Sequence, residues 1–253
     1  MNAHAAGPGS NTTLRAARRL LLLSNSRDAQ GRYLVHCRDA LAAHLAGVRE
    51  VAFVPYAGVT VPWDGYADRL AAALAPLGIR VRGVHTVGDP AALVRDAPAV
   101  AVGGGNTFHL LAELQRRGLL DALRARAAEG APYVGWSAGS VVACPTIRTT
   151  NDMPVTEPPH GLVALGLVGL QINAHFTDAH PPGFQGETRR ERLAEFVAAN
   201  PGTAVVGLPE GSWVEARGGA VTVGGAHAAL VFRAGAEAEV VAAGASLAGA
   251  EAH

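Results

Sequence analysis

The sequence predicts an α/β protein with a mostly parallel sheet and helices on both faces of that sheet. Short apolar runs alternate along the chain with stretches whose apolar residues recur at helical spacing. The composition, with 49% hydrophobic and 17% charged residues over 253 positions, is typical of a globular protein with a large core. Ligands of parallel sheets bind beyond the carboxyl ends of the strands, so the loops that leave those ends are the first candidates for a functional site.

The first part of the chain is expected to alternate strand, helix, strand and helix. Leu20–Ser24 and Val51–Pro55 are apolar enough for buried strands. Tyr33–Leu45, between them, carries apolar residues at roughly helical spacing. Trp63–Leu77 is rich in alanine and leucine, and Gly78 marks the end of this expected helix.

The alternation continues through the middle of the chain. In order, the expected elements are a strand at Ile79–Val84, a short helix at Pro90–Arg95, a strand at Ala99–Val102, helices at Phe108–Arg117 and Leu119–Glu129, and a strand at Tyr133–Trp136. The Gly103–Thr107 loop and the turn at Ser137 both leave carboxyl ends of strands. We therefore expect them to flank one crevice.

The last part of the chain has a different character. Pro145–Pro159 is rich in threonine and proline and is a candidate lid. Thr188–Ala199 is expected to be a helix that opens with a capping box, because Glu191 follows Thr188 by three positions. The remaining expected strands are Val168–Asn173 and Ala204–Leu208, and antiparallel strands at one edge of the sheet at Ser212–Glu215, Ala220–Val223 and Ala229–Phe232.

No linker divides the chain, so we expect a single α/β domain over residues 19–235. Residues 1–18 are expected to be a disordered extension, and residues 236–253 an edge strand with a frayed tail. Lys plus Arg and Asp plus Glu number 21 each, so no general field favours nucleic acid or an anionic membrane. No stretch approaches the ~20 apolar residues of a membrane span. Cys37 and Cys144 are too few for a disulfide framework and are expected to be buried and reduced, as in the cytoplasm.

The segment Gly135–Gly139 has the strand–turn–helix pattern of a nucleophile elbow, G-x-S-x-G. Small neighbours let a substrate approach the Ser137 hydroxyl in a strained turn, and the helix that follows directs free N–H groups toward it. The pattern also occurs in loops without chemistry, so the rest of the site must support it. We expect Ser137 to be the nucleophile of a hydrolase.

A serine nucleophile needs a base, and the chain has ten histidines. His175 is favoured because it follows the strand Val168–Asn173 at the end where the crevice should lie. His109, in the first turn after the triple glycine, and His180, five residues beyond His175, stay open as alternatives.

The imidazole in turn needs an orienting acid. Glu210 is favoured because the apolar run before it leads to the same rim of the sheet. Asp152 and Asp178 lie in loops that could also reach the site. The order serine, histidine, glutamate differs from the serine, acid, histidine order of α/β-hydrolases, which argues against that fold.

Two backbone N–H groups should hold the oxyanion. Ala138, directly after the nucleophile, supplies one, and the triple glycine supplies the other, with Gly105 favoured. A phosphate-binding loop is the rival interpretation of Gly103–Gly105, but both the G-x-G-x-x-G spacing and the lysine of a P-loop are missing.

Arg189 is expected at the first position of a helix, where the macrodipole disfavours a cation. One interpretation is a surface ion pair with Glu187 or Glu191, which would contribute little to stability. The other is recognition of an anionic substrate group by the two-pronged guanidinium.

Together these residues resemble the peptidase E family, the aspartyl dipeptidases among the serine peptidases. The similarity extends from about Arg19 to Ala234, and its most specific part is the long block at Cys144–Pro154. The matching segments are Leu22–Ser26, Pro55–Thr60, Gly103–Phe108, Gly135–Gly139, Cys144–Pro154, Ile172–Thr177, Gly186–Arg189 and Gly207–Gly211.

The resemblance implies a fold like that of class I glutamine amidotransferases, with serine in place of their elbow cysteine. It also implies hydrolysis of dipeptides that begin with aspartate. By position, Ser137 matches the nucleophile, His175 the base and Glu210 the acid, and Arg189 looks like the arginine that reads the aspartyl carboxylate. Asp152 matches a family aspartate that rivals Glu210 for the acid role.

Asn106 and Asp152 are also expected to contact the substrate. The chain departs from the family at His109, Ser140 and Ala174, where glutamine, a smaller residue and proline are expected. These departures bear on fine substrate preference. No metal or other cofactor is expected.

The expected partner is a small dipeptide, with no nucleic acid or membrane, for a cytoplasmic monomer or homodimer. Two other functions stay open. One is hydrolysis of an aspartyl-linked storage polymer, as in the related cyanophycin-degrading enzymes, and the other is a catalytically idle binding or chaperone-like module on the same fold.

Overall fold

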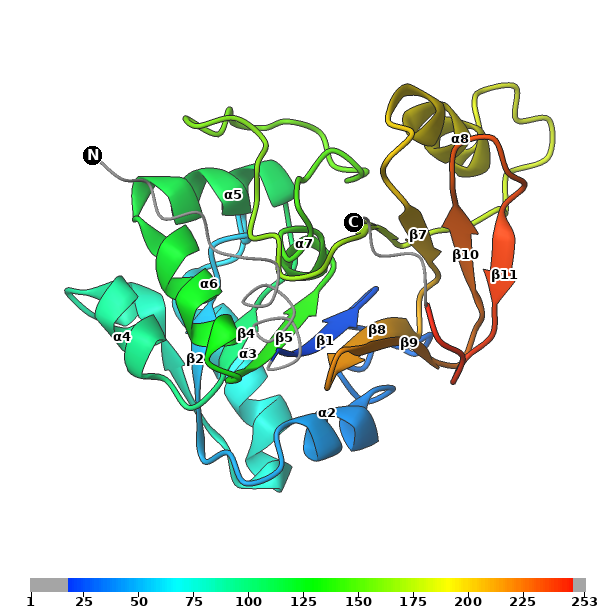
Figure 1. The fold of residues 1–253 in the computed structure, drawn as a ribbon. Helices are drawn as coiled ribbons and strands as arrows, with labels where there is room; N and C mark the ends of the chain where they lie inside the picture. The colour runs from blue at the N-terminus through cyan, green and yellow to red at the C-terminus, as the bar shows by residue number, and fades with distance from the viewer. Residues whose placement is uncertain (1–17, 248–253) are drawn as a thin grey trace, which may run out of the picture.

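A seven-stranded sheet forms the centre of the protein, which a computed structural model describes over residues 18–247 (Figure 1). In spatial order its strands are β3 (Arg80–Gly83), β2 (Glu50–Val54), β4 (Val100–Val102), β5 (Pro132–Trp136), β1 (Arg19–Leu23), β8 (Ser212–Arg217) and β9 (Ala220–Gly225). The first five are parallel to one another, while β8 and β9 run antiparallel to their neighbours. The prediction of a mostly parallel central sheet is confirmed.

Helices cover both faces of this sheet, as the sequence predicts (Figure 1). The strand β1 shows why, because Leu20 and Leu22 pack into one core while Leu21 and Leu23 pack into the other. The helices of the first core are α4 (Pro90–Asp96), α5 (Thr107–Arg116), α6 (Leu119–Ala128) and the short α7 (Ala138–Val141), and those of the second are α2 (Arg38–His44) and α3 (Trp63–Leu74). Two short 3₁₀ turns, η1 (Ala75–Leu77) and η2 (Val84–Thr86), follow α3 and β3.

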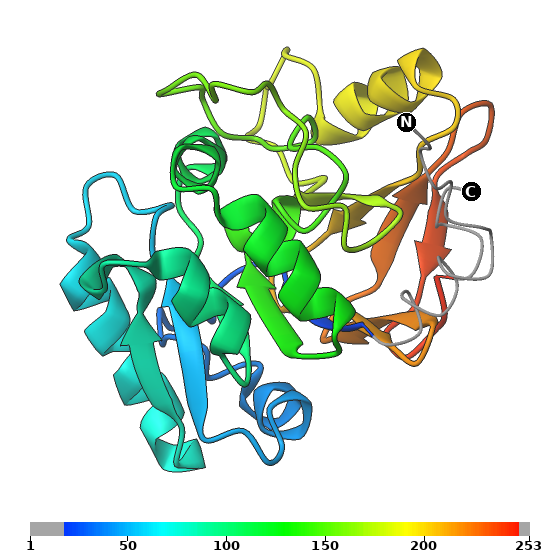
Figure 2. The same ribbon diagram turned by 60° about the vertical axis from the view of Figure 1, so that its left-hand side comes forward.

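A second sheet of four strands lies beside the first. Its strands in spatial order are β11 (Glu239–Val241), β10 (Ala229–Phe232), β7 (Val205–Leu208) and β6 (Gln171–Ala174). Figure 2 shows the orange and red strands of this sheet on the right, with the helix α8 (Arg189–Ala199) above them. Side chains of α8 share a small apolar cluster with β7 and β10.

The expectation of a single sheet is therefore wrong. The strands β6 and β7 are parallel to each other, as expected, but they do not continue the order of the first sheet. The reason is that β8 occupies the free edge of β1, so no edge is left there for β6. Of the expected antiparallel edge strands, β8 and β9 do lie at one edge of the first sheet, whereas β10 pairs with β7 in the second.

Two local predictions had different outcomes. The capping box at the start of α8 is confirmed, because the side chains of Thr188 and Glu191 each accept a hydrogen bond from the other residue's backbone N–H. The helix expected over Tyr33–Leu45 begins only at Arg38. Leu34 has a left-handed backbone, with φ 55°, and its N–H donates to the carbonyl of Ser26, so the preceding residues close a loop instead.

The expected extension at residues 1–18 lies, apart from Arg18, outside the described residues, as does the end of the expected tail at residues 248–253. Among the residues that the structure describes, none of the helices has the length and apolar character needed to cross a bilayer.

Candidate active site

Ser137 lies in a sharp turn between β5 and α7, as expected for a nucleophile elbow. Its backbone is left-handed, with φ 51° and ψ −116°, which is a costly conformation for a residue other than glycine. The two glycines of the motif are required by close packing. A Cβ at Gly135 would lie 2.4 Å from the carbonyl oxygen of Gly139, and a Cβ at Gly139 would lie 2.1 Å from that of Val102.

His175 and Glu210 meet Ser137 from the second sheet. His175 directly follows β6 and Glu210 comes two residues after β7, so the parallel pairing of these strands brings both side chains to the same end. His175 Nε2 lies 2.9 Å from Ser137 Oγ, and His175 Nδ1 lies 2.6 Å from Glu210 Oε1. When the carboxylate accepts from Nδ1–H, the lone pair of Nε2 faces the serine hydroxyl, which is the arrangement a general base needs.

Two residues that the sequence analysis did not single out hold this arrangement together. The Ser24 hydroxyl accepts the His175 backbone N–H at 2.8 Å and donates to the Leu208 carbonyl at 2.7 Å. The Asn25 side-chain oxygen accepts the backbone N–H of Gly211, next to Glu210, at 2.8 Å. Ser24 and Asn25, the Ser24–Asn25 clasp below, are buried although polar. The sequence signal that could have identified them is their position, two polar residues directly after the four leucines of β1.

The triple glycine lies against the nucleophile. A Cβ at Gly104 would come within 3.0 Å of Ser137 Cβ, and one at Gly105 would lie 2.2 Å from the Ala57 carbonyl oxygen. Within residues 18–247, no protein acceptor is found for the backbone N–H of Gly105 or of Ala138. These two N–H groups are the expected oxyanion donors, and both residues line cavities that Ser137 also lines.

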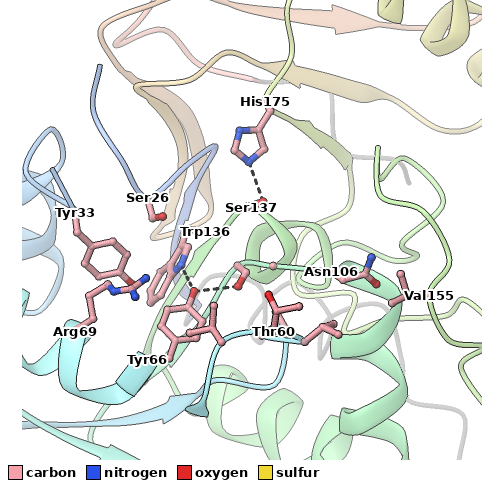
Figure 3. Close-up of a pocket in the computed structure, with 16 residues that line it drawn as sticks. Ser26, Tyr33, Thr60, Tyr66, Arg69, Asn106, Trp136, Ser137, Val155 and His175 are labelled. Carbon is pink, nitrogen blue, oxygen red and sulfur yellow. Dashed lines mark hydrogen bonds between the residues drawn. The ribbon is translucent and has the colours of Figure 1, made fainter. Parts of the chain in front are cut away.

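Ser137 lines two cavities. The larger, of about 520 Å³, is lined by Gly104, Gly105 and Ser137, together with Tyr33, Arg69 and Trp136 (Figure 3). The prediction that the triple-glycine loop and the elbow flank one crevice is confirmed. The smaller cavity, of about 180 Å³, contains one acidic and one basic side chain, Asp152 and Arg189.

Arg189 does not form the surface ion pair that was one of its two interpretations. Glu187 pairs with Arg192 at 3.7 Å, and Glu191 is used by the capping box. Arg189 instead donates to the carbonyl oxygens of His175 and Ala174 and is half-buried, and burial lowers the pKa of its guanidinium. No carboxylate of the described residues lies within ion-pair distance of it. The cation therefore faces the cavity without an anionic partner.

Asp152 and Asn106 are held against the start of α5. One carboxylate oxygen of Asp152 accepts from the backbone N–H and the hydroxyl of Thr107, and Asp152 makes no hydrogen bond to His175. Asn106 caps α5 by accepting the backbone N–H of His109, and its amide donates to the Met153 carbonyl. Both residues thus fasten the 145–159 loop to α5.

The alternative residues lie elsewhere. His180 stacks on Phe184 with ring centroids 5.0 Å apart, and Asp178 pairs with Arg190 at 2.5 Å. Cys144 is fully buried, and burial raises the pKa of its thiol to about 12, so it stays protonated. Cys37 is likewise a free, buried thiol.

Comparisons with known proteins give the relatives of the chain and of its fold. Residues 20–224 match the sequence profile of Peptidase family S51. The chain is 52% identical over 225 residues to a protein named Peptidase E from Citrobacter koseri, a match that covers 89% of this chain and 98% of the relative. The Peptidase E of Salmonella typhimurium is 50% identical over the same coverage. The crystal structure of a peptidase from an acI-B1 Actinobacterium superposes with a TM-score of 0.67, covering 91% of this chain and 96% of that one, at 17% identity, and so shares the fold.

Proposed function

The chain belongs to peptidase family S51 and is a serine-type dipeptidase, and we propose that it hydrolyses dipeptides with an N-terminal aspartate. Its relatives named Peptidase E, about half identical over most of the chain, favour this function over a storage-polymer hydrolase or an idle binding module. The observation that carries the proposal is the hydrogen-bonded relay of Ser137, His175 and Glu210.

The proposed mechanism begins with attack by Ser137 Oγ on the peptide carbonyl, while His175 Nε2 takes the serine proton. Glu210 keeps the imidazole in the required tautomer and stabilises the imidazolium. The Ala138 and Gly105 N–H groups hold the oxyanion. His175 then passes the proton to the leaving amine, and a water molecule hydrolyses the aspartyl ester of Ser137. The contacts of 2.9 and 2.6 Å along the relay support these roles.

The smaller cavity supports selection of aspartate. An N-terminal aspartyl residue carries an α-ammonium and a β-carboxylate, and this cavity offers one carboxylate and one guanidinium. We assign the β-carboxylate to Arg189 and the ammonium to Asp152, with Asn106 holding the loop that carries Asp152. A volume of about 180 Å³ suits a short side chain.

The larger cavity would then receive the second residue. Its walls are largely aromatic and aliphatic, which fits an apolar side chain at this position. Arg69 is exposed at its rim, 6.0 Å from the centroid of the Tyr33 ring. A cation there suits the free carboxylate that every dipeptide carries at its second residue.

The balance of 21 basic and 21 acidic residues gives no general attraction to nucleic acid or anionic membranes. We further infer a cytoplasmic enzyme that acts on small peptides as a monomer or homodimer, with one domain over residues 19–235 followed by the edge strand β11.

The test is hydrolysis of Asp-Leu by the purified protein beside Asn-Leu, Glu-Leu, isoaspartyl-leucine and an aspartyl-polymer fragment. Ser137→Ala should lower kcat at least ~10⁴-fold, since the nucleophile is lost, with an unchanged far-UV spectrum. A fluorophosphonate should label the wild type at Ser137 and leave the variant unlabelled. Residual turnover of Asp-Leu by Ser137→Ala near the wild-type rate would refute the assignment.

A further inference from the structure

The hydroxyl of Tyr66 connects the nucleophile strand to the triple-glycine loop. Tyr66 lies on α3, is 6% exposed, and accepts a hydrogen bond from Trp136 Nε1 at 2.9 Å. The same hydroxyl donates to the Gly104 carbonyl at 3.0 Å. Figure 3 shows both contacts as dashed lines beneath Ser137. Since Trp136 directly precedes Ser137, one oxygen atom contacts both halves of the site.

The bond to Gly104 determines the direction of the Gly105 N–H. The Gly104 carbonyl and the Gly105 N–H belong to one planar peptide group, and no described peptide bond is cis. In a trans peptide these two groups point in opposite directions. A carbonyl held toward Tyr66 therefore turns the N–H of Gly105 away from Tyr66.

The peptide on the other side of Gly105 is held as well. The Asn106 N–H donates to the Ala57 carbonyl at 2.9 Å. Gly105 itself has φ 141°, a conformation open to glycine, and the Ala57 backbone fills the space of any side chain. Of the two hydrogen bonds that flank Gly105, only the one to Gly104 comes from a side chain.

We propose that Tyr66 is a positioning residue that aims the Gly105 N–H at the oxyanion formed on Ser137. This inference rests on the proposed function and adds a residue to it. Tyr66 does not touch the substrate's reacting atoms. It holds the donor in place before the reaction, which is how an oxyanion site avoids reorganisation when charge develops.

Burial is consistent with this role. It raises the pKa of the Tyr66 hydroxyl, so the group stays a neutral donor through the working range of a histidine base. The adjacent Gly103 also fits, because the Tyr66 side chain occupies the space of a Gly103 side chain, with the phenolic oxygen 2.8 Å from an added Cβ. The loop and the phenol thus pack as one unit.

The ring alone could instead serve the core, since it lies 5.0 Å from Phe53 and 6.4 Å from Trp136, centroid to centroid. Tyr66→Phe separates the two roles because it keeps the ring and removes the hydroxyl. The matched control is Tyr56→Phe, a fully buried tyrosine of the same region whose ring faces Arg117 and whose hydroxyl does not reach the triple glycine.

The experiment measures kcat and KM for Asp-Leu, the inhibition constant of an aspartyl boronic acid, and the dissociation constant of free aspartate. For Tyr66→Phe we expect kcat to fall between about 10- and 100-fold, somewhat less than for complete loss of an oxyanion donor, with KM within about twofold. The boronic acid, which forms a tetrahedral adduct on Ser137, should lose affinity by the same factor, while aspartate binding stays unchanged. Tyr56→Phe should resemble the wild type in all four quantities.

An unchanged kcat in Tyr66→Phe would overturn the proposal, as would equal losses in boronic acid and aspartate affinity, which would indicate a general defect of the pocket. The rate at which a fluorophosphonate labels Ser137 separates failure of the Tyr66 proposal from failure of the proposed function, because labelling needs the nucleophile and the oxyanion site but not the correct dipeptide. A wild type that is labelled but does not cleave Asp-Leu loses only its substrate assignment, and slower labelling of Tyr66→Phe still supports the role. A wild type that is neither labelled nor active overturns both.

Discussion

Ser137 and His175 are two of only three non-glycine residues with a left-handed backbone among residues 18–247, with φ 51° and 55°. Such conformations cost on the order of 1–3 kcal/mol each and persist only where the surroundings hold them. Here the surroundings are specific hydrogen bonds, from Ser137 N–H to the Leu23 carbonyl and from His175 N–H to the Ser24 hydroxyl. The strain therefore lies in the two residues whose side chains form the proposed contact between nucleophile and base.

Replacing Arg189 should remove the preference for aspartate. In Arg189→Met the cavity loses its cation, and the substrate carboxylate loses a charge-assisted contact worth about 1.5–3 kcal/mol. We expect kcat/KM for Asp-Leu to fall about 100-fold, with much less change for Asn-Leu, whose side chain has the same shape without the charge. The measurement is the ratio of kcat/KM for the two substrates.

Arg192→Met is the matched control, because Arg192 lies on the same helix but is exposed and pairs with Glu187. It should leave the ratio unchanged. If Arg189→Met lowered kcat/KM equally for Asp-Leu and Asn-Leu, the main role of Arg189 would be its contact with the His175 carbonyl and not substrate recognition.

At the scale of elements, the end of β1 contacts the ends of two strands of the other sheet. The Ser24–Asn25 clasp joins β1 to the residues that follow β6 and β7. His175 carries the imidazole, and Leu208 and Gly211, the other two residues held by the clasp, lie on either side of Pro209 and Glu210. The clasp thus couples stability to the geometry of the site.

Ser24→Ala should lower both the free energy of unfolding and the catalytic rate. The His175 N–H would be left buried without its acceptor, which costs about 1–3 kcal/mol of unfolding free energy. The imidazole would also lose its backbone anchor, so kcat should fall between about 10- and 100-fold. Urea unfolding and Asp-Leu kinetics measure the two effects.

Ser26→Ala provides the comparison for unfolding, since its side chain makes no hydrogen bond among the described residues. An unfolding free energy of Ser24→Ala equal to that of Ser26→Ala would show that the clasp contributes nothing.

Most elements were predictable because local patterns determine them. The continuous apolar runs of β1 and β5 are typical of strands that are covered on both faces. The capping box indicates where α8 begins. The start of α2 was not, because apolar residues at helical spacing also suit a loop whose Leu34 turns left-handed. Strand pairing was the other failure, since it depends on which edge β8 occupies.

At the scale of the whole molecule, the same limits apply to the site. That Ser137, His175 and Glu210 converge could be predicted because each follows a strand at its carboxyl end, and this rule holds although the strands belong to two sheets. Tyr66 could not be named, since its hydroxyl acts on a loop 38 positions away and nothing local in α3 marks it. Ser24 was visible only as a polar residue after an apolar run.

The stability of the whole fold should depend on pH through His44. Burial, with a smaller effect of Arg19, lowers the pKa of its imidazole from 6.5 to about 4. The unfolded chain binds a proton below pH 6.5 while the folded chain does not until about pH 4. Stability is therefore full above the unfolded pKa and falls as the pH drops toward the folded one, by about 2 kcal/mol between pH 7 and 4.5.

His44→Leu should remove this part of the pH dependence, whatever its effect on absolute stability. Urea unfolding at several pH values measures it, with His160→Gln as the comparison because His160 is exposed. Parallel pH profiles for the wild type and His44→Leu would contradict the assignment.

The hydroxyl of the proposed nucleophile belongs to the seven-stranded sheet, whereas the imidazole and carboxylate both follow strands of the four-stranded one. A small relative displacement of the two sheets would lengthen the Ser137–His175 contact and leave the His175–Glu210 pair intact. Under mild heating or at low denaturant concentration, the enzyme would lose activity while its circular dichroism spectrum was still that of the native fold. Loss of activity would then detect a displacement of one sheet relative to the other before any spectroscopic measure of folding.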